Sequence, residues 1–192
     1  VIVASKHNRP QWLNMEDAVL HCKKGLGELK FISDNVDKPD LVLVSCGDTP
    51  TIEIVAAKKI LSEFLKNIKI RVINVIDLMR LQSDVEHPHG ISDEEYDKLF
   101  TKNKPIIFAF HGYPTLIHLL TYKRKNKNLH VHGYKEEGTI TTPFDMRVQN
   151  EIDRYHLVLN AIKYLSISDE ERTLITNYCN DIIYLIEPGR IQ

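Results

Sequence analysis

The chain has 192 residues, of which 43% are hydrophobic and 27% are charged, and its formal net charge is −1. This length and composition are typical of one soluble globular domain with a substantial core, and they argue against disorder. The longest apolar runs, such as Ile106–Phe110, are far shorter than the roughly 20 residues of a membrane-spanning helix. A charge near zero also gives no global attraction for nucleic acid, so we expect neither a membrane nor a nucleic-acid partner.

Short apolar runs of strand length alternate along the chain with segments of helical periodicity. The predicted strands are residues 1–4, 41–45, 70–75, 105–110 and 129–132. The predicted helices are residues 14–26 and 50–66, segments beginning at 92, 114 and 143, and residues 168–186. Helical crossovers between strands give parallel pairing, so we predict a single α/β domain with three α/β/α layers and a mainly parallel sheet, and with the last helix packed on its outside.

Several helix starts carry local capping signals. Thr49 and Thr142 each precede a proline, which predicts a hydroxyl cap followed by proline at the first helical position. Pro114 repeats the proline signal. Ser92 and Ser168 are each followed three residues later by a glutamate, which predicts two capping boxes.

For two of the predicted helices, the sequence also predicts which surfaces are buried. The segment from Pro143 to about residue 163 is predicted as one long surface helix, with Asp153 and His156 on its solvent-facing side. The helix at 50–66 carries two apolar stripes, which is more than one contact requires. That helix is therefore either deeply buried or part of an interface.

Three polar loops are expected at the carboxyl ends of the strands, where open α/β sheets bind ligands and where helix N-termini favour anions: residues 45–49, 111–113 and 133–139. The candidates for an anion site or an interdomain contact are Gly47, Thr49, His111, Gly112, Tyr113, Lys135, Glu136, Glu137 and Thr142. Capping and turn formation are the competing interpretation for these residues. We assign no catalytic residue and no metal ligand.

Other motifs are weaker. Gly25 and Gly27 lack the third glycine of a dinucleotide loop and predict a helix C-cap instead. The histidine pairs 87/89 and 130/132 have the spacing of a two-histidine metal clamp, but no further ligand completes either set. The basic run 123–127 predicts a solvated helix end rather than a polyanion site.

The cysteines and the N-terminus bear on cellular context. The three cysteines are odd in number, widely spaced and set in apolar segments, which indicates reduced thiols and a cytoplasmic location. The chain starts in a strand pattern without an initiator methionine, so we expect it to be a piece of a longer protein.

The segment 111–145, HGYPTLIHLLTYKRKNKNLHVHGYKEEGTITTPFD, combines glycines, helix starts and dense polar chemistry. It closely resembles the C-terminal region of the phosphoketolases, which are thiamine diphosphate enzymes. The resemblance extends to residues 1–4 with Gln11-Trp12-Leu13, to EHPHG at 86–90 and to DRYHL at 153–157, so it covers nearly the whole chain.

The resemblance implies a longer parent enzyme, a carbon–carbon lyase that cleaves xylulose 5-phosphate with phosphate to acetyl phosphate and glyceraldehyde 3-phosphate. Fructose 6-phosphate is a second candidate substrate. Thiamine diphosphate and Mg²⁺ would lie between two other domains of that enzyme. The Gly47-Asp48 pair with Asn74 imitates the magnesium motif of such enzymes, but Thr49 replaces the second glycine and Asn74 falls in a strand.

By the same resemblance, the chain would be a non-catalytic C-terminal domain, similar to that of the transketolases. Residues 1–13 would be an incoming strand and linker, and residues 168–192 the outer C-terminal helix. The domain would pack on the catalytic domains of the same polypeptide and support a homodimer or higher homo-oligomer. We expect the fragment alone to be inactive and to hold no cofactor.

Two other functions stay open on the sequence alone. One is a regulatory module that binds a nucleotide or phosphorylated metabolite at the helix starts, and the other is a self-sufficient small enzyme. The carboxylates of Glu136 and Glu137 add nothing obvious to a core, so we expect their loop to contact a neighbouring domain or subunit.

Overall fold

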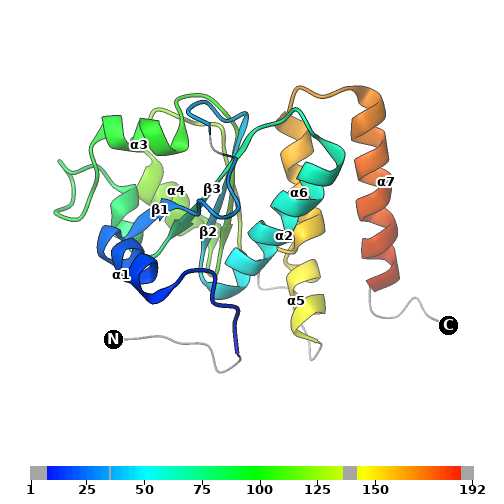
Figure 1. Ribbon diagram of the computed structural model, residues 1–192, viewed down its shortest axis with the longest axis horizontal. Helices are drawn as coiled ribbons and strands as arrows, with labels where there is room; N and C mark the ends of the chain where they lie inside the picture. The colour runs from blue at the N-terminus through cyan, green and yellow to red at the C-terminus, as the bar shows by residue number, and fades with distance from the viewer. Residues whose placement is uncertain (1–7, 35, 136–141, 187–192) are drawn as a thin grey trace.

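A computed structural model describes residues 8–34, 36–135 and 142–186, and within them the predicted α/β architecture is confirmed (Figure 1). One five-stranded sheet has the order β1-β3-β2-β4-β5. Its strands are β1 (Leu26–Glu28), β2 (Leu41–Cys46), β3 (Ile70–Val75), β4 (Ile106–Phe110) and β5 (Leu129–His132). All pair in parallel except β1, which is antiparallel to β3. The strand predicted at residues 1–4 lies outside the described residues.

Helices cover both faces of this sheet (Figure 1). One face carries α1 (Met15–Lys24), the 3₁₀ helix η1 (Leu78–Leu81), α3 (Asp93–Phe100) and α4 (Pro114–Thr121). The other carries α2 (Asp48–Phe64), α5 (Pro143–Gln149) and α6 (Arg154–Tyr164), with α7 (Asp169–Ile186) outside them. Phe64 of α2 meets Tyr178 of α7 with ring centroids 5.1 Å apart.

The core has one apolar layer on each side of the central strand. Every residue of β2 is buried. Leu41 and Leu43 belong to the layer under α2 and α6, whereas Val42 and Val44 belong to the layer under α3 and α4. Such burial on both faces is what a central parallel strand requires. Helix α2 packs on the sheet and also against α6, which itself contacts β4, so of the two alternatives for its wide apolar surface, deep burial is confirmed.

The connections diverge at the carboxyl edge of the sheet. The chain leaves β2 into α2 on one face, whereas it leaves β4 into α4 on the other (Figure 1). The carboxyl ends of β2 and β4 therefore form the topological switch point, which is where open α/β sheets bind their ligands.

The single helix predicted from Pro143 is wrong, because the structure has two helices there. The chain turns between α5 and α6, and Glu151 takes a positive φ of 54°. Asp153 then caps α6 by accepting bonds from the backbone N–H groups of Tyr155 and His156. Asp153 is fully buried, so it does not face solvent as the periodicity predicted. His156 bonds to Asp153 and keeps 23% of its side chain exposed, so it is only partly on the solvent-facing side.

Most of the capping predictions are confirmed. Thr142, Ser92 and Ser168 each accept a bond from the backbone N–H three residues later, at 3.2 Å. The exception is α2, which begins at Asp48 after Gly47, so Thr49 is not its cap.

The first helix ends as predicted. Gly25 caps α1 in the left-handed conformation, with φ of 75°. The chain then enters β1 directly, and the sequence gave no separate signal for this three-residue strand.

The solvated helix end predicted for the basic run 123–127 is wrong for Arg124, the second residue of the run. Arg124 is only 2% exposed. Its guanidinium donates to the carbonyl oxygens of Leu81 and Ile91 and to the Asp93 carboxylate, at 2.8 to 3.0 Å. It also lies 4.3 Å from the centre of the Tyr96 ring. Arg124 therefore joins α4 to η1 and α3 from inside the fold.

We predict that Arg124→Ala lowers the free energy of unfolding by about 3 kcal/mol, because it leaves several buried carbonyl groups without a donor. Lys125→Ala is the neighbouring control, since Lys125 is exposed and lies 3.9 Å from Asp97. That control should change stability by less than about 0.5 kcal/mol. Urea denaturation measures both, and equal losses would contradict the anchoring role of Arg124.

Candidate functional site

The loops after β2 and β4 are locked together at the switch point. Gly47 takes a φ of 109°, and a Cβ atom placed on it would lie 2.7 Å from the Cβ of His111. The backbone N–H of His111 donates to the Cys46 carbonyl at 3.0 Å. Glycine is needed at position 47 both for the conformation and for the close approach.

The loop after β5 joins the same group. A Cβ atom on Gly133 would lie 2.2 Å from the Gly112 carbonyl oxygen, and the Tyr134 N–H donates to that oxygen at 2.9 Å. The ring centroids of His111 and Tyr134 lie 5.4 Å apart. The structure thus brings together the beginnings of all three loops that the sequence placed at this edge.

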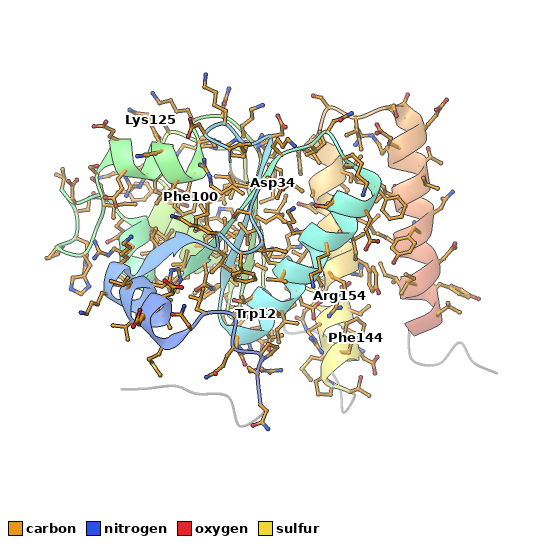
Figure 2. The ribbon with its side chains drawn as sticks, in the orientation of Figure 1. Trp12, Asp34, Phe100, Lys125, Phe144 and Arg154 are labelled. Carbon is orange, nitrogen blue, oxygen red and sulfur yellow. The ribbon has the colours of Figure 1, made fainter. Side chains whose placement is uncertain are left out.

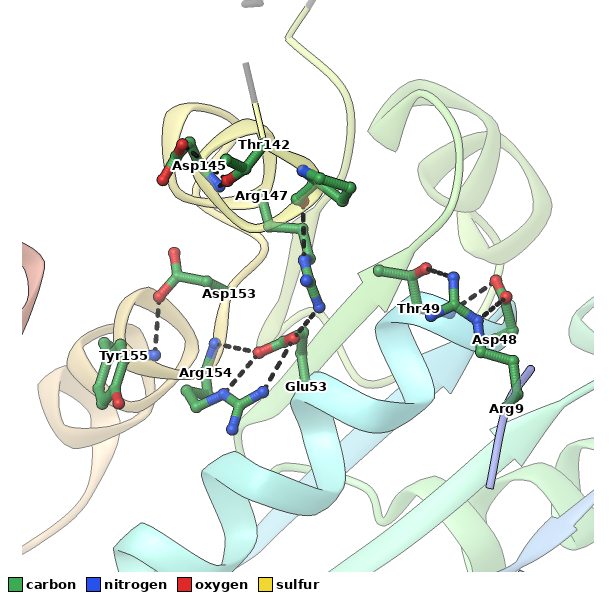
Figure 3. Close-up of polar contacts among 11 residues, drawn as sticks. Arg9, Asp48, Thr49, Glu53, Thr142, Asp145, Arg147, Asp153, Arg154 and Tyr155 are labelled. Atoms are coloured by element: carbon green, nitrogen blue, oxygen red, sulfur yellow. Dashed lines mark hydrogen bonds and ion pairs between the residues drawn. The ribbon is translucent and has the colours of Figure 1, made fainter. Parts of the chain in front are cut away.

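A polar cluster lies next to these contacts, and Figure 3 shows three of its members, Arg9, Asp48 and Thr49. Arg9, which the sequence analysis did not select, bonds Asp48 at 2.6 Å and the Thr49 hydroxyl at 3.2 Å. The His111 ring nitrogen Nδ1 lies 3.8 Å from the Asp48 carboxylate. Burial, with a further contribution from the Asp48 charge, raises the pKa of Tyr134. We call Arg9, Asp48, Thr49, His111 and Tyr134 the edge cluster.

Of the remaining candidates, Lys135 lies against the turn between α5 and α6. Lys135 donates from its backbone to the Asn150 side chain at 2.8 Å, and its amine pairs with Glu151 at 2.5 Å. The bond from Lys135 lowers the pKa of Glu151 against the opposing effect of burial. Thr142 serves as the cap of α5.

Two candidates cannot be placed, because Glu136 and Glu137 lie outside the described residues. Tyr113 is 53% exposed at the start of α4. It is therefore the most exposed large side chain among the candidates that the structure describes.

A buried carboxylate that the sequence analysis missed ties α2 to α5 and α6. Glu53 has no exposed surface. It accepts from Arg147 at 2.5 Å and from the backbone N–H and Nε of Arg154, both at 2.9 Å (Figure 3). The guanidinium groups of Arg147 and Arg154 also lie 4.9 and 5.7 Å from the centre of the Phe144 ring. Figure 2 shows Arg154 next to Phe144. The pairing with Glu53 raises the pKa of Arg154. We call Glu53, Arg147 and Arg154 the Glu53 cluster.

The residues that imitate a magnesium motif do not fit that role. Asp48 is held by Arg9, as described above. The Asn74 side chain bonds His21 at 3.0 Å and the hydroxyl groups of Ser45 and Thr51 at 3.1 Å. Among the described residues, no three His, Cys, Asp or Glu side chains are placed to hold a metal ion.

The histidine pairs have other contacts. His130 stacks on Tyr164 with centroids 3.6 Å apart, and His132 donates to the Glu151 carbonyl at 2.9 Å. Burial is the main cause that lowers the pKa of both rings. His89 pairs with Asp77 at 2.9 Å.

None of the helices in the described ranges is long and apolar enough to cross a membrane.

A cavity of about 530 Å³ lies next to the edge cluster. Its walls come from α1, from the first turns of α2 and from the carboxyl ends of β2 and β3, and residues 9–13 cross over it. The sequence predicted these residues as part of an incoming strand and linker, not as part of a cavity wall.

The family model of the XFP C-terminal domain matches residues 6–185. The chain belongs to this family. A relative of this XFP C-terminal domain, a probable phosphoketolase of Rhodopirellula baltica, is 58% identical over 167 residues, which are 86% of the chain and 21% of the relative. A probable phosphoketolase of Chlorobaculum tepidum is 53% identical over 184 residues, which are 94% of the chain and 23% of the relative. The XFP C-terminal domain therefore spans between a fifth and a quarter of the length of these relatives.

The solved structures give a likeness in fold alone. A transketolase from Leishmania mexicana superposes with a TM-score of 0.55 at 15% identity, over 76% of this domain and 18% of that chain. Both the family resemblance and the fold class predicted from the sequence are confirmed.

We predict that Glu53→Gln lowers the free energy of unfolding by about 2 to 4 kcal/mol, because it leaves two arginines without their shared carboxylate. The lower value of this range takes account of the partial solvent exposure of Arg147 and Arg154. Glu63→Gln is the matched control, since Glu63 is exposed on the same helix. It should cost less than about 0.5 kcal/mol in the same denaturation experiment. Similar losses for the two variants would show that the Glu53 cluster does not stabilise the fold.

Proposed function

We propose that the chain is the non-catalytic C-terminal domain of a phosphoketolase, and that it packs on the catalytic domains of the same polypeptide and supports assembly. The observation that carries this proposal is the 58% identity to a probable phosphoketolase of which the chain covers 21%. The contacts at the carboxyl edge support it. Asp48 and Lys135 are paired with neighbouring side chains, which suits a rigid packing surface better than a reacting site.

In this proposal the parent enzyme is a carbon–carbon lyase. It cleaves xylulose 5-phosphate, with fructose 6-phosphate as a second candidate. The two-carbon fragment loses one water molecule to become an acetyl group, which is transferred to phosphate as acetyl phosphate. Thiamine diphosphate with Mg²⁺ supplies the carbanion chemistry, as such cofactors do. Because Asp48 and Asn74 do not fit that cofactor, we assign no chemical step to residues of this chain.

The proposed role of this chain in the parent enzyme is to present a rigid surface. The glycine contacts at Gly47 and Gly133 hold the loops after β2, β4 and β5 in one arrangement. The Glu53 cluster fixes α5, which begins a few residues after Glu136 and Glu137 in the sequence. We propose that this edge, with Tyr113 and His111 exposed on it, contacts the catalytic domains. We also propose a homo-oligomeric parent.

The free cysteines support the proposal of a cytoplasmic parent. Cys46 and Cys179 are unpaired and buried, and burial raises the pKa of each thiol to about 12. Cys22 is also unpaired but is exposed.

A regulatory module for nucleotides or phosphorylated metabolites has less support. Among the described residues of the carboxyl edge, Arg9 is paired with Asp48 and Lys135 with Glu151. A phosphate would have to displace one of these carboxylates before it could bind the cation.

We predict that the full-length protein that contains this chain forms acetyl phosphate from xylulose 5-phosphate and phosphate, in a reaction that requires thiamine diphosphate and Mg²⁺. The 192-residue chain alone should form none and should not bind the cofactor. Hydroxamate detection of acetyl phosphate and calorimetric titration with the cofactor measure the two expectations. Turnover by the chain alone would favour a self-sufficient enzyme, and a full-length protein inactive in this assay would contradict the proposed activity.

We predict that Tyr113→Ser in the full-length protein reduces activity or subunit assembly by roughly tenfold or more, as truncation of a buried interface tyrosine does. Tyr184→Ser on α7 is the matched control, because the two tyrosines are 53% and 56% exposed in the chain described here. Neither change should alter the stability of the isolated chain by more than about 0.5 kcal/mol. Steady-state kinetics and sedimentation separate the outcomes, and equal behaviour of the two full-length variants would exclude Tyr113 from the contact.

A further inference from the structure

We propose that the cavity at the carboxyl ends of β2 and β3 binds an uncharged, planar aromatic molecule with an amide-like polar edge. The inference is independent of the function proposed above, because it rests on the size, the lining and the charge balance of this cavity alone.

The size of the cavity sets it apart from a packing defect. Protein interiors contain few voids larger than one water molecule. The cavity measures about 530 Å³, within the range of roughly 300 to 1,000 Å³ that is usual for small-molecule sites. It also lies at the carboxyl edge of the sheet, where α/β proteins place their ligands.

The apolar part of the lining suits a flat ligand. It is formed by Trp12, Leu13, Ala18, Ile52, Val75 and Ile76. Trp12 stacks on Phe31 with centroids 5.7 Å apart and an interplanar angle of 8°, so the orientation of its indole is fixed. Figure 2 shows Trp12 where the N-terminal segment passes the start of α2. Because Trp12 and Ile76 are 37% and 48% exposed, the cavity is accessible from solvent.

A fixed polar edge faces this apolar lining. The Asn74 oxygen Oδ1 lies 3.0 Å from the His21 ring nitrogen Nε2, and the amide nitrogen donates to Ser45 and Thr51. These bonds determine which way the amide points. A carbonyl oxygen has two lone pairs, so Oδ1 can accept a second bond from an N–H group of a ligand.

The charges of the lining exclude ions as preferred ligands. The Asp, Glu, Lys and Arg side chains among the described residues around the cavity are Arg9 and Asp48, and they pair with each other at 2.6 Å. The other ionisable ring, that of His21, bonds Asn74. An anion or cation that entered would lose part of its hydration without gaining an unpaired carboxylate, ammonium or guanidinium partner. An uncharged ligand avoids that cost.

The indole of Trp12 reports binding directly, because the chain contains one tryptophan. We expect benzamide to change the fluorescence of Trp12 saturably. Benzoate has nearly the same shape but carries a negative charge, and it should bind about tenfold more weakly or worse, a difference of about 1.4 kcal/mol. No saturable response to benzamide, or benzoate binding as tightly as benzamide, would overturn the proposal.

A cavity-filling variant tests the location. Ala18→Phe should weaken benzamide binding by about tenfold or more, whereas Thr173→Phe, on the exposed surface of α7, should leave it unchanged. Should Ala18→Phe fail to fold, nuclear Overhauser effects between benzamide and the methyl groups of Ile52 and Ile76 in the unmodified chain provide the location. Full binding by a folded Ala18→Phe variant, or the lack of those effects at saturation, would refute the site.

Discussion

The carboxylate of Glu53 constrains how α5 and α6 lie against α2. A fully buried charge costs several kcal/mol unless partners surround it, so a fold that places Glu53 inside must also bring cations to it. Arg147 and Arg154 meet that requirement from α5 and α6. Once both helices are fixed against α2, α6 offers the surface on which α7 packs. One buried carboxylate, paired with two arginines, thus acts together with the apolar layer to fix α5, α6 and, through α6, α7.

The carboxyl edge depends on a different constraint, which is the close approach of backbones. Gly47 and Gly133 leave no space for a Cβ atom against His111 and Gly112. The polar side chains above them are then paired locally, as Arg9 is with Asp48. An edge built in this way keeps its shape without a ligand. It can serve as a preformed contact surface, and it has little freedom to reorganise around a phosphate.

The sequence predicted the features that depend on local signals. The parallel strands from β2 to β5 follow from short apolar runs, and the caps at Ser92, Thr142 and Ser168 from residues within one turn. The break before α6 was missed because apolar periodicity continues across it, although Asp153 is a favoured N-cap residue and was a usable signal.

The missed parts of the site depend on partners far away in the sequence. Arg9 meets Asp48 across 39 positions, and Arg154 meets Glu53 across 101. Neither pairing can be recognised from a short stretch of sequence. The burial of Arg124 within a basic run could not be predicted for the same reason. A glutamate inside the apolar surface of α2 was the one available hint that a buried charge needed partners.

The unequal environments of the three cysteines give the chain a chemical selectivity. Thiol reagents attack the thiolate, and at neutral pH Cys46 and Cys179, with pKa values of about 12, are almost wholly un-ionised and are shielded by the core. Cys22 is exposed on α1 and belongs to the wall of the cavity that Trp12 also lines. Alkylation of the folded chain is therefore directed to a single position, so a spectroscopic label can be placed beside Trp12 without mutagenesis.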